Sequence, residues 1–341
     1  MPISAWPSTP AEKLTRLFRG FWVSQAIYVA ARLGLADLMA DGPRSVADLA
    51  SATGAHAPTL RRVLRLLAGE GIFAEAEDGR FELTPMAAPL LRDKGELRLQ
   101  VLFVGREASW RAAGDLLHAV KTGETPFDHV HGASFFESLR QHPDEAQLFD
   151  QLMVVNTTPV ARAVAGAYDF SSMRTIIDVG GGRGALALGI LAAHPQLRGV
   201  IFDQPAVAAG ARDAIAAAGL SERCEAVGGD FFEAVPDGGD AYLVKFILHD
   251  WDDERSVAIL RTCRRAIPHG GRLLVVEFVI GHGNEPSFAR TQDMNMLINL
   301  GGQERTEAEY RALFEASGFA LTRTIPVFGD MRIIEGVPAA G

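Results

Sequence analysis

The chain has 341 residues, of which 48% are hydrophobic and 22% are charged, and its net charge is −9. These values are typical of a soluble globular protein with two or three domains, and the negative charge excludes a general attraction to nucleic acid or anionic membranes. The two cysteines, Cys224 and Cys263, provide no disulfide framework and favour a reducing, cytoplasmic location.

The N-terminal segment lacks the basic-then-apolar order of a signal peptide. The most apolar early stretch, residues 21–40, carries Arg32 and Asp37, so it predicts a packed helix rather than a membrane span. The next segment predicts a helix, a turn, a second helix and a hairpin. The signals are Ser45 as a helix cap, Gly54 as the break between the helices and Asp78-Gly79 as the hairpin turn. This order predicts a winged-helix domain over residues 1–95.

Residues 96–170 predict a helical connector that is rich in aromatic side chains and contributes to a substrate pocket. Over residues 171–341, short apolar runs alternate with helical segments, which is typical of a doubly wound, mostly parallel α/β sheet of the Rossmann type. Two final strands joined at Gly329 predict an antiparallel hairpin at the sheet edge. The runs are TIIDV, GVIFD, CEAVGGD, AYLVK and RLLVVEFVI.

A glycine-rich loop follows the first of these strands in IIDVGGGRGALAL, where Gly180, Gly182 and Gly184 are spaced G-x-G-x-G. Glycine lets the backbone turn tightly and lets a ligand approach, but such loops also bind NAD and FAD or are plain turns. Asp203 closes the next strand, where an acid can bind the hydroxyls of a ribose. Asp178 would repel a phosphate but suits an ammonium group. The pattern therefore favours S-adenosylmethionine over a dinucleotide.

Five motifs, DVGGGRG, FDQP, GGDFFEAVP, LVKFILHDWDDE and GGQERTEAEY, resemble those of the S-adenosylmethionine-dependent O-methyltransferases, in their order and over nearly the whole chain. This is the family of plant caffeate-type and bacterial natural-product enzymes. The resemblance implies that the N-terminal domain forms a homodimer. The residues expected to bind the cofactor are Asp178, Gly180, Gly182, Asp203, Gly229, Asp230, Phe231, Lys245 and Asp250.

His249 is the expected general base, because it follows a parallel strand at the sheet edge where ligands bind. A phenol with a pKa near 10 is only about one part in a thousand ionised at pH 7, and an imidazole with a pKa of about 6.5 is neutral often enough to take its proton. The family places two acids as partners of this base, here Glu277 and Glu304. A carboxylate bonded to the imidazole would orient the ring and stabilise the imidazolium.

The acceptor is expected to be an aromatic small molecule from bacterial secondary metabolism. Apolar walls with a few amides suit a flat, oxygenated ring, and the candidates for its pocket are Phe149, Met153, Met294, Asn295 and Asn299.

No metal is expected. Asp250, Asp252 and Asp253 point in different directions around a helix start, where Asp252 is the predicted cap. His129 and His131 have a spacing known from zinc sites, but no further ligand set accompanies them, which predicts a surface loop.

Two alternatives stay open. The chain could use S-adenosylmethionine for hydroxylation, decarboxylation or cyclisation, although the presence of His249 with both acids favours methyl transfer. It could also be a DNA-binding regulator, but residues 1–100 hold 12 basic and 11 acidic residues, without the strong basic face that DNA binding needs. Methylation of a nitrogen or a carboxylate is a further possibility for the acceptor.

Overall fold

The structure, a computed structural model, describes residues 9–93 and 96–339. Contacts between residues divide the chain into two units, Met1–Trp110 and Arg111–Gly341. The first unit contains one cluster of buried hydrophobic residues, and the second unit contains two. Among the described helices, none combines the length and apolar character needed to cross a bilayer.

The first unit consists of the long helix α1, several short helices and one hairpin, with the helix, turn, helix and hairpin of residues 45–83 in the order expected. Ser45 caps a helix by accepting a hydrogen bond from the Asp48 N–H, and Gly54 ends that helix with φ of 68°. Gly79, with φ of 79°, turns the hairpin. The winged-helix assignment itself stays a prediction. The elements are α1 Pro10–Leu33, α2 Leu35–Leu38, α3 Val46–Thr53, α4 Ala57–Gly69, β1 Phe73–Glu75, β2 Phe81–Leu83, the 3-10 helix η1 Pro85–Leu90 and α5 Arg98–Val104.

The stretch of residues 21–40 packs as its sequence predicts, since Ala30, Leu35 and Met39 are buried in α1, α2 and the turn that follows. Helix α1 ends at Gly34, which has φ of 65°, and its N-terminal half leaves an apolar face uncovered. Leu17 is 78% exposed and Phe18 is 72% exposed. Leu14, Phe21 and Trp22 extend the same face, since residues three and four apart are neighbours on a helix. Within the described residues, Phe21 meets the Trp110 ring, and the rest of this apolar α1 face is largely exposed.

A run of helices precedes the sheet, as the aromatic-rich segment predicts. Pro126, Pro143 and the cap residue Ser134 begin three of them. His129 and His131 lie within α8, so the surface loop expected for them is wrong. The helices are α6 Glu107–Gly114, α7 Leu116–Thr122, α8 Pro126–His131, α9 Phe135–Gln141 and α10 Pro143–Ala167.

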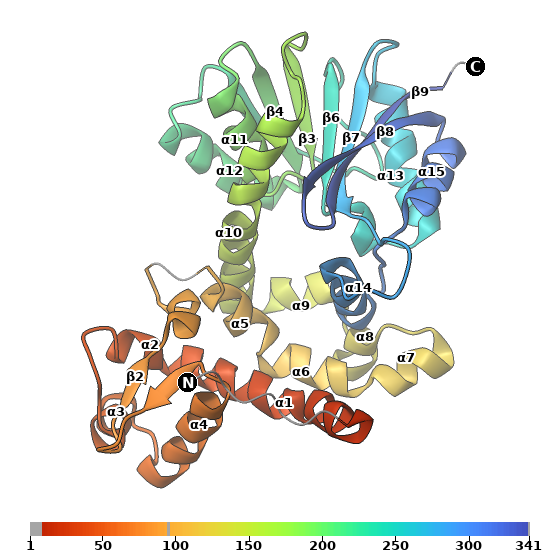
Figure 1. Cartoon of the computed structure of the whole chain (residues 1–341). Helices are drawn as coiled ribbons and strands as arrows, with labels where there is room; N and C mark the ends of the chain where they lie inside the picture. The colour runs from red at the N-terminus through yellow and green to blue at the C-terminus, as the bar shows by residue number, and fades with distance from the viewer. Residues whose placement is uncertain (1–8, 94–95, 340–341) are drawn as a thin grey trace. The chain divides into compact units, whose positions relative to one another are not determined.

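The second unit contains a seven-stranded sheet of order β5-β4-β3-β6-β7-β9-β8 (Figure 1). Strands β3 to β7 are parallel, and β9 and β8 continue the sheet as an antiparallel hairpin that turns at Gly329. The expected Rossmann-like sheet with an edge hairpin is confirmed. The strands are β3 Thr175–Val179, β4 Arg198–Asp203, β5 Cys224–Gly228, β6 Ala241–Lys245, β7 Arg272–Phe278, β8 Phe319–Phe328 and β9 Met331–Pro338.

Alternate residues of each strand belong to two cores on opposite faces of this sheet. Ile176 and Leu243 belong to the core that contains residues of α10, α11 and α12. Tyr242 and Val244 belong to the core that contains residues of α13 and α15. The carboxyl ends of the parallel strands therefore meet at one edge, where the site lies. The remaining helices are α11 Ala185–Ala193, α12 Pro205–Ala217, η2 Leu248–Asp250, α13 Asp253–Ala266, α14 Phe288–Asn299 and α15 Glu307–Ala316.

Candidate active site

The glycine loop after β3 is shaped so that only glycine fits. Gly180, Gly182 and Gly184 all have positive φ, between 59° and 82°, a region that favours glycine. A Cβ added at Gly180 would come within 2.4 Å of the Ile247 side chain, and the Phe231 ring lies on the same side at 3.6 Å. The backbone of Gly180 therefore lies next to the Ile247 and Phe231 side chains without a side chain of its own, which lets a ligand approach the backbone closely.

Two carboxylates flank this loop. Asp203 accepts hydrogen bonds from the Gly182 N–H at 2.8 Å and from the Gln204 N–H at 2.7 Å. Asp178 is 1% exposed and accepts one from the Ala187 N–H at the start of α11. Burial raises the pKa of Asp178 to about 7, against the hydrogen bond from Ala187 and the charge of Lys245, which lower it. The structure thus joins Gly180, Gly182, Asp178 and Asp203 in one cluster.

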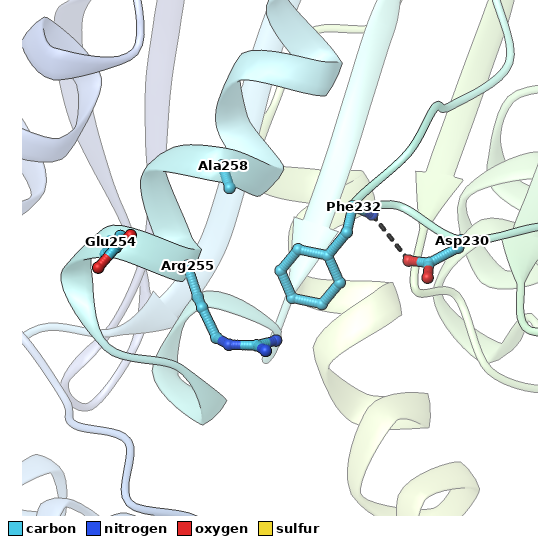
Figure 2. Close-up of a pocket in the computed structure, with 5 residues that line it drawn as sticks. All are labelled: Asp230, Phe232, Glu254, Arg255 and Ala258. Carbon is cyan, nitrogen blue, oxygen red and sulfur yellow. Dashed lines mark hydrogen bonds between the residues drawn. The ribbon is translucent and has the colours of Figure 1, made fainter.

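Asp230 lines a pocket of about 500 Å³ (Figure 2). Its exposed carboxylate accepts a hydrogen bond from the Phe232 N–H at 2.8 Å. The Arg255 guanidinium lies over the rings of Phe232 and Trp251, at 4.9 and 5.0 Å from their centroids. Gly229 precedes Asp230, and a Cβ there would meet the Phe202 ring at 2.5 Å. The end of β5 therefore presents an accessible acid beside aromatic rings.

Lys245 links the cofactor residues to the histidine. Its Nζ donates to the Thr157 hydroxyl on α10 at 2.8 Å and lies 4.1 Å from the centroid of the Phe246 ring. Burial lowers the pKa of Lys245 to about 8, although Asp178, Glu277 and Asp250 favour its charged form. Thr157 is a partner that the sequence did not reveal, because a distant helix supplies it.

His249 lies on a 3-10 turn just after β6. The chain reaches this turn through Phe246, which has φ of 54° and is the non-glycine residue with positive φ among those described. Such a conformation is strained for a side chain with a Cβ. The Phe246 ring stacks on the His249 imidazole at 5.1 Å and 14° and on Phe278 at 5.2 Å. The strained residue therefore holds one face of the imidazole.

Two acids contact the imidazole. Nδ1 of His249 lies 2.8 Å from Oε1 of Glu304, and Nε2 lies 3.4 Å from Oδ1 of Asp250. Burial lowers the pKa of His249, but the charges of Glu304 and Asp250 outweigh burial and raise this pKa to about 9. A ring with this pKa is protonated at pH 7. The sequence had suggested a largely neutral imidazole, because the spacing of the acids does not reveal how closely they enclose the ring.

Glu277 is buried beside the same ring, but its hydrogen bonds go elsewhere. Its Oε1 accepts from the backbone N–H groups of Ile247, Leu248 and His249, at 3.1, 2.7 and 3.4 Å. Its Oε2 accepts from the Tyr310 hydroxyl at 2.5 Å. The carboxylate thus binds the turn that carries His249, whereas the sequence suggested a bond to the imidazole.

The structure adds Arg305, which the sequence analysis did not select. Its guanidinium is fully buried and donates to the carbonyls of Leu248 and Trp251 at 2.9 and 2.8 Å. It also contacts Asp253 at the start of α13. The sequence feature that could have indicated Arg305 is its position directly after Glu304 in the motif GGQERT. Nearby, a Cβ at Gly302 would lie 2.0 Å from the His249 carbonyl oxygen, so this turn packs against the histidine turn without space for a side chain.

The expected acceptor residues lie on two helices. Phe149 and Met153 precede Thr157 at helical spacing on α10, so they follow the face that carries the partner of Lys245. Asn299 on α14 is 7% exposed and donates to Oδ1 of Asn295 at 3.0 Å. Met294, by contrast, is 37% exposed. The Glu304 N–H donates to Asp293 of α14, which ties this helix to the histidine site.

The comparisons with known proteins agree on one family. The O-methyltransferase domain family matches residues 110–320, and the O-methyltransferase dimerisation domain matches residues 15–93. The chain is 49% identical over 327 residues to the phenazine O-methyltransferase PhzM of Lysobacter antibioticus, with 95% of each chain covered. It is 41% identical to a mitomycin biosynthesis 6-O-methyltransferase of Streptomyces lavendulae, over 98% of this chain and 96% of that protein.

Solved structures match over the same length. The O-methyltransferase NcsB1 from neocarzinostatin biosynthesis, in complex with S-adenosylmethionine and 2-hydroxy-5-methyl naphthoic acid, superposes with a TM-score of 0.83 at 35% identity. The match covers 93% of this chain and 96% of that one. A phenazine-1-carboxylate N-methyltransferase of Pseudomonas aeruginosa is also similar, at 35% identity over 95% of this chain and 96% of that protein.

Proposed function

Since the chain belongs to the O-methyltransferase family with an N-terminal dimerisation domain, we propose that it methylates a phenolic hydroxyl of an aromatic secondary metabolite. In this proposal His249 is the general base and the reaction needs no metal. The chain is an O-methyltransferase of class EC 2.1.1, and its cofactor is S-adenosylmethionine.

The residues at the carboxyl edge of the sheet fit this cofactor. Asp203 keeps lone pairs for ribose hydroxyls beside its two backbone donors. Asp178 is a buried acid that suits an ammonium group and would repel a phosphate. Asp230 is accessible to an adenine amino group. When bound, S-adenosylmethionine supplies a methyl group attached to its sulfonium sulfur, and the resulting thioether is the leaving group.

The observation that carries the proposal is the buried imidazole with Nδ1 directed to Glu304. A carboxylate only accepts, so the neutral ring holds its proton on Nδ1 and leaves the Nε2 lone pair for an acceptor hydroxyl. The hydroxyl proton would pass to Nε2, which would leave an electron-rich oxygen. With the cofactor bound, the methyl carbon would form its bond to this oxygen as its bond to sulfur breaks, and the neutral thioether would leave. Glu304 and Asp250 then stabilise the imidazolium that forms.

The negative charge of the site affects whether the His249 imidazole is protonated. At a pKa of about 9, His249 is protonated at neutral pH because of the surrounding carboxylates. A cofactor that brings a positive charge offsets part of that negative charge and lowers the pKa of the ring. We therefore expect cofactor binding to generate the neutral base.

Metal independence is argued from the donors of Glu277. Single ligand atoms of His249, Glu277 and Glu304 lie within 4.8 Å of one another, close enough to suggest an ion. However, Oε1 of Glu277 already accepts from three backbone N–H groups, and Oε2 accepts from Tyr310. Both oxygens of Glu277 therefore have hydrogen-bond donors from the protein itself. This supports a structural role for Glu277 without a metal.

The acceptor class follows from the unpaired polar atoms. Among the described residues, Oε2 of Glu304 and Oδ1 of Asn299 are buried without a hydrogen-bond partner. Buried acceptors of this kind favour a ligand that carries donor groups. A phenol with a neighbouring hydroxyl or amino group meets this requirement.

The test is methyl transfer from methyl-labelled cofactor to a panel of phenols, hydroxyphenazines, hydroxynaphthoates and matched aromatic amines, with and without EDTA. We expect O-methyl products at equal rates in both conditions. Exclusive N-methylation would show that the acceptor atom is a nitrogen and would contradict the proposed methylation of a hydroxyl. Cofactor-dependent conversion of an acceptor without label transfer would instead support a non-methylating reaction. Loss of activity in EDTA that zinc or magnesium restores would contradict metal independence.

A further inference from the structure

A second cluster of metal-binding side chains lies outside the catalytic site, around α7 and α8. Asp115 precedes α7, His118 lies in its first turn, Glu124 follows it and His129 lies in α8. Nδ1 of His129 is 2.7 Å from Asp115, and Nε2 of His118 is 2.7 Å from Glu124. Two imidazoles and two carboxylates thus converge from two consecutive helices and the turn between them.

The spacing of these groups suits a small divalent cation. One ligand atom each from Asp115, His118 and His129 lies within 4.8 Å of the others. Tetrahedral zinc has ligand bonds of about 2.0–2.2 Å to nitrogen and oxygen, which brings its ligand atoms to within about 3.5 Å of each other. The three ligand atoms are therefore only slightly farther apart than in a metal site. The side chains of Asp115, His118 and His129 are 23–48% exposed, so they can move and an ion can reach them.

The arrangement of the two rings is unusual for separate surface histidines. The imidazoles of His118 and His129 stack at 3.7 Å and 5°. A metal lies in the plane of each ring that binds it, so one ring must turn out of this stack on coordination. The ion would take the place of the hydrogen bond between Nδ1 of His129 and the Asp115 carboxylate. The two carboxylates of the cluster balance a dication, and Glu124 can orient the His118 ring as carboxylates do beside metal ligands.

We propose that Asp115, His118 and His129 form a binding site for a divalent transition-metal ion such as Zn²⁺, with Glu124 orienting His118. Imidazole nitrogen and carboxylate oxygen are donors that zinc prefers. The site is separate from methyl transfer and is distinct from the residues assigned to catalysis.

The bound ion would brace the acceptor side of the enzyme. It would tie α7 to α8, and α8 begins after its cap residue Thr125. The Thr125 hydroxyl lies 2.3 Å from the position of a Cβ on Gly301, which leads directly to Gly302 against the His249 carbonyl. A metal at this cluster would therefore stiffen the helices that pack next to α14.

The experiment uses the metal-free full-length chain and titrates Zn²⁺ against a chromogenic chelator, with Co²⁺ as a spectroscopic probe. We expect one equivalent of Zn²⁺ and the visible absorption of low-coordinate Co²⁺. H118A and H129A should each lose this step, whereas H282A, which removes an exposed loop histidine, should keep it.

Further variants separate misfolding and the catalytic cluster from this site. D115N keeps the size of the side chain and should weaken binding by at least about tenfold, the lower end for disturbed metal sites. H249A should retain the full equivalent. Absence of binding in the parent protein, or unchanged binding in H118A and H129A, would overturn the proposal. Loss of the metal in H249A would place the ion in the catalytic cluster and would overturn it as well.

Discussion

Carboxylates surround the buried His249 ring, and their charges raise the pKa of His249. Glu304 contacts Nδ1 at 2.8 Å, and Asp250 lies 3.4 Å from Nε2. Both charges oppose the effect of burial, which alone would lower the pKa. The pKa of about 9 therefore depends on the acids, and changing one of them should change the pH at which the base becomes active.

The E304Q variant tests this dependence. In the parent enzyme at saturating cofactor, kcat/KM for the acceptor should rise with pH as the enzyme–cofactor complex loses the His249 proton, at a pH below the pKa of about 9 of the cofactor-free ring. The amide removes a negative charge that holds this proton, so the pKa of His249 falls and the rising limb moves to lower pH. The maximal rate should also fall, because the imidazolium that forms has lost a counter-charge.

The pH profile should be measured with two acceptors whose phenol pKa values differ, since a limb due to the substrate would move with the acceptor. The matched control is E307Q, which changes an exposed acid on α15. A rising limb that stays in place in E304Q would show that Glu304 does not set the pKa of the base.

At the scale of elements, the histidine turn is held from three directions. Glu277 of β7 accepts from its N–H groups, Arg305 donates to its carbonyls, and Gly302 packs against the His249 carbonyl oxygen. The turn therefore has few degrees of freedom, although it follows a residue with positive φ. Preorganisation of this kind aligns a base before the substrate arrives.

The G302A variant tests the close approach. Its Cβ would lie 2.0 Å from the His249 carbonyl oxygen, so the backbone must shift. A displacement of about 1 Å can cost about a hundredfold in rate, and we expect a fall in kcat of this order with cofactor affinity retained in calorimetry. G270A has open space around its new methyl group and is the control. Equal rates for both variants would exclude tight packing at Gly302 as a requirement.

The R305M variant tests the buried guanidinium. It removes the Arg305 donor from the Trp251 carbonyl, whereas the Leu248 carbonyl keeps hydrogen bonds from the Ser256 hydroxyl and the Trp251 N–H. An unsatisfied buried acceptor costs about 1–3 kcal/mol. We expect a lower free energy of unfolding in urea by a few kcal/mol. R311M removes an exposed pair with Glu307 on α15 and should cost about 0.3–0.5 kcal/mol. Similar losses in the two variants would contradict a clamping role for Arg305.

These elements also show what the sequence could predict. The strands were predictable because strands buried on both faces are continuous apolar runs, as in AYLVK. Asp252 was predictable as a helix cap because capping is local, and it accepts from the Arg255 N–H. The partners of Glu277 depend on the 3-10 turn, and the pairing of His118 with His129 depends on how two short helices pack. No spacing rule in a single sequence reports such contacts.

For the whole molecule, the exposed apolar face of α1 lies in the segment that matches the O-methyltransferase dimerisation domain, residues 15–93. Leu17 and Phe18 are more than 70% exposed within one chain. Apolar patches of this kind mark protein–protein interfaces. We propose that a second copy of the chain covers this face in a homodimer.

The dimer proposal predicts that the double variant L17E/F18E is monomeric in light scattering coupled to size-exclusion chromatography, while the parent is dimeric. Two buried carboxylates would be too costly at an apolar interface. A216E places the same residue on the exposed surface of α12 and should stay dimeric. A dimeric L17E/F18E protein would show that the interface lies elsewhere.

The central claim is that the imidazole of His249 removes the proton of the acceptor hydroxyl. The most direct measurement compares single-turnover methyl transfer by the parent and by H249A, with cofactor affinity measured by calorimetry on both. We predict unchanged cofactor binding and a loss of rate of about 10²–10⁴-fold. Methyl transfer by H249A at the parent rate would contradict the assignment of this histidine as the base.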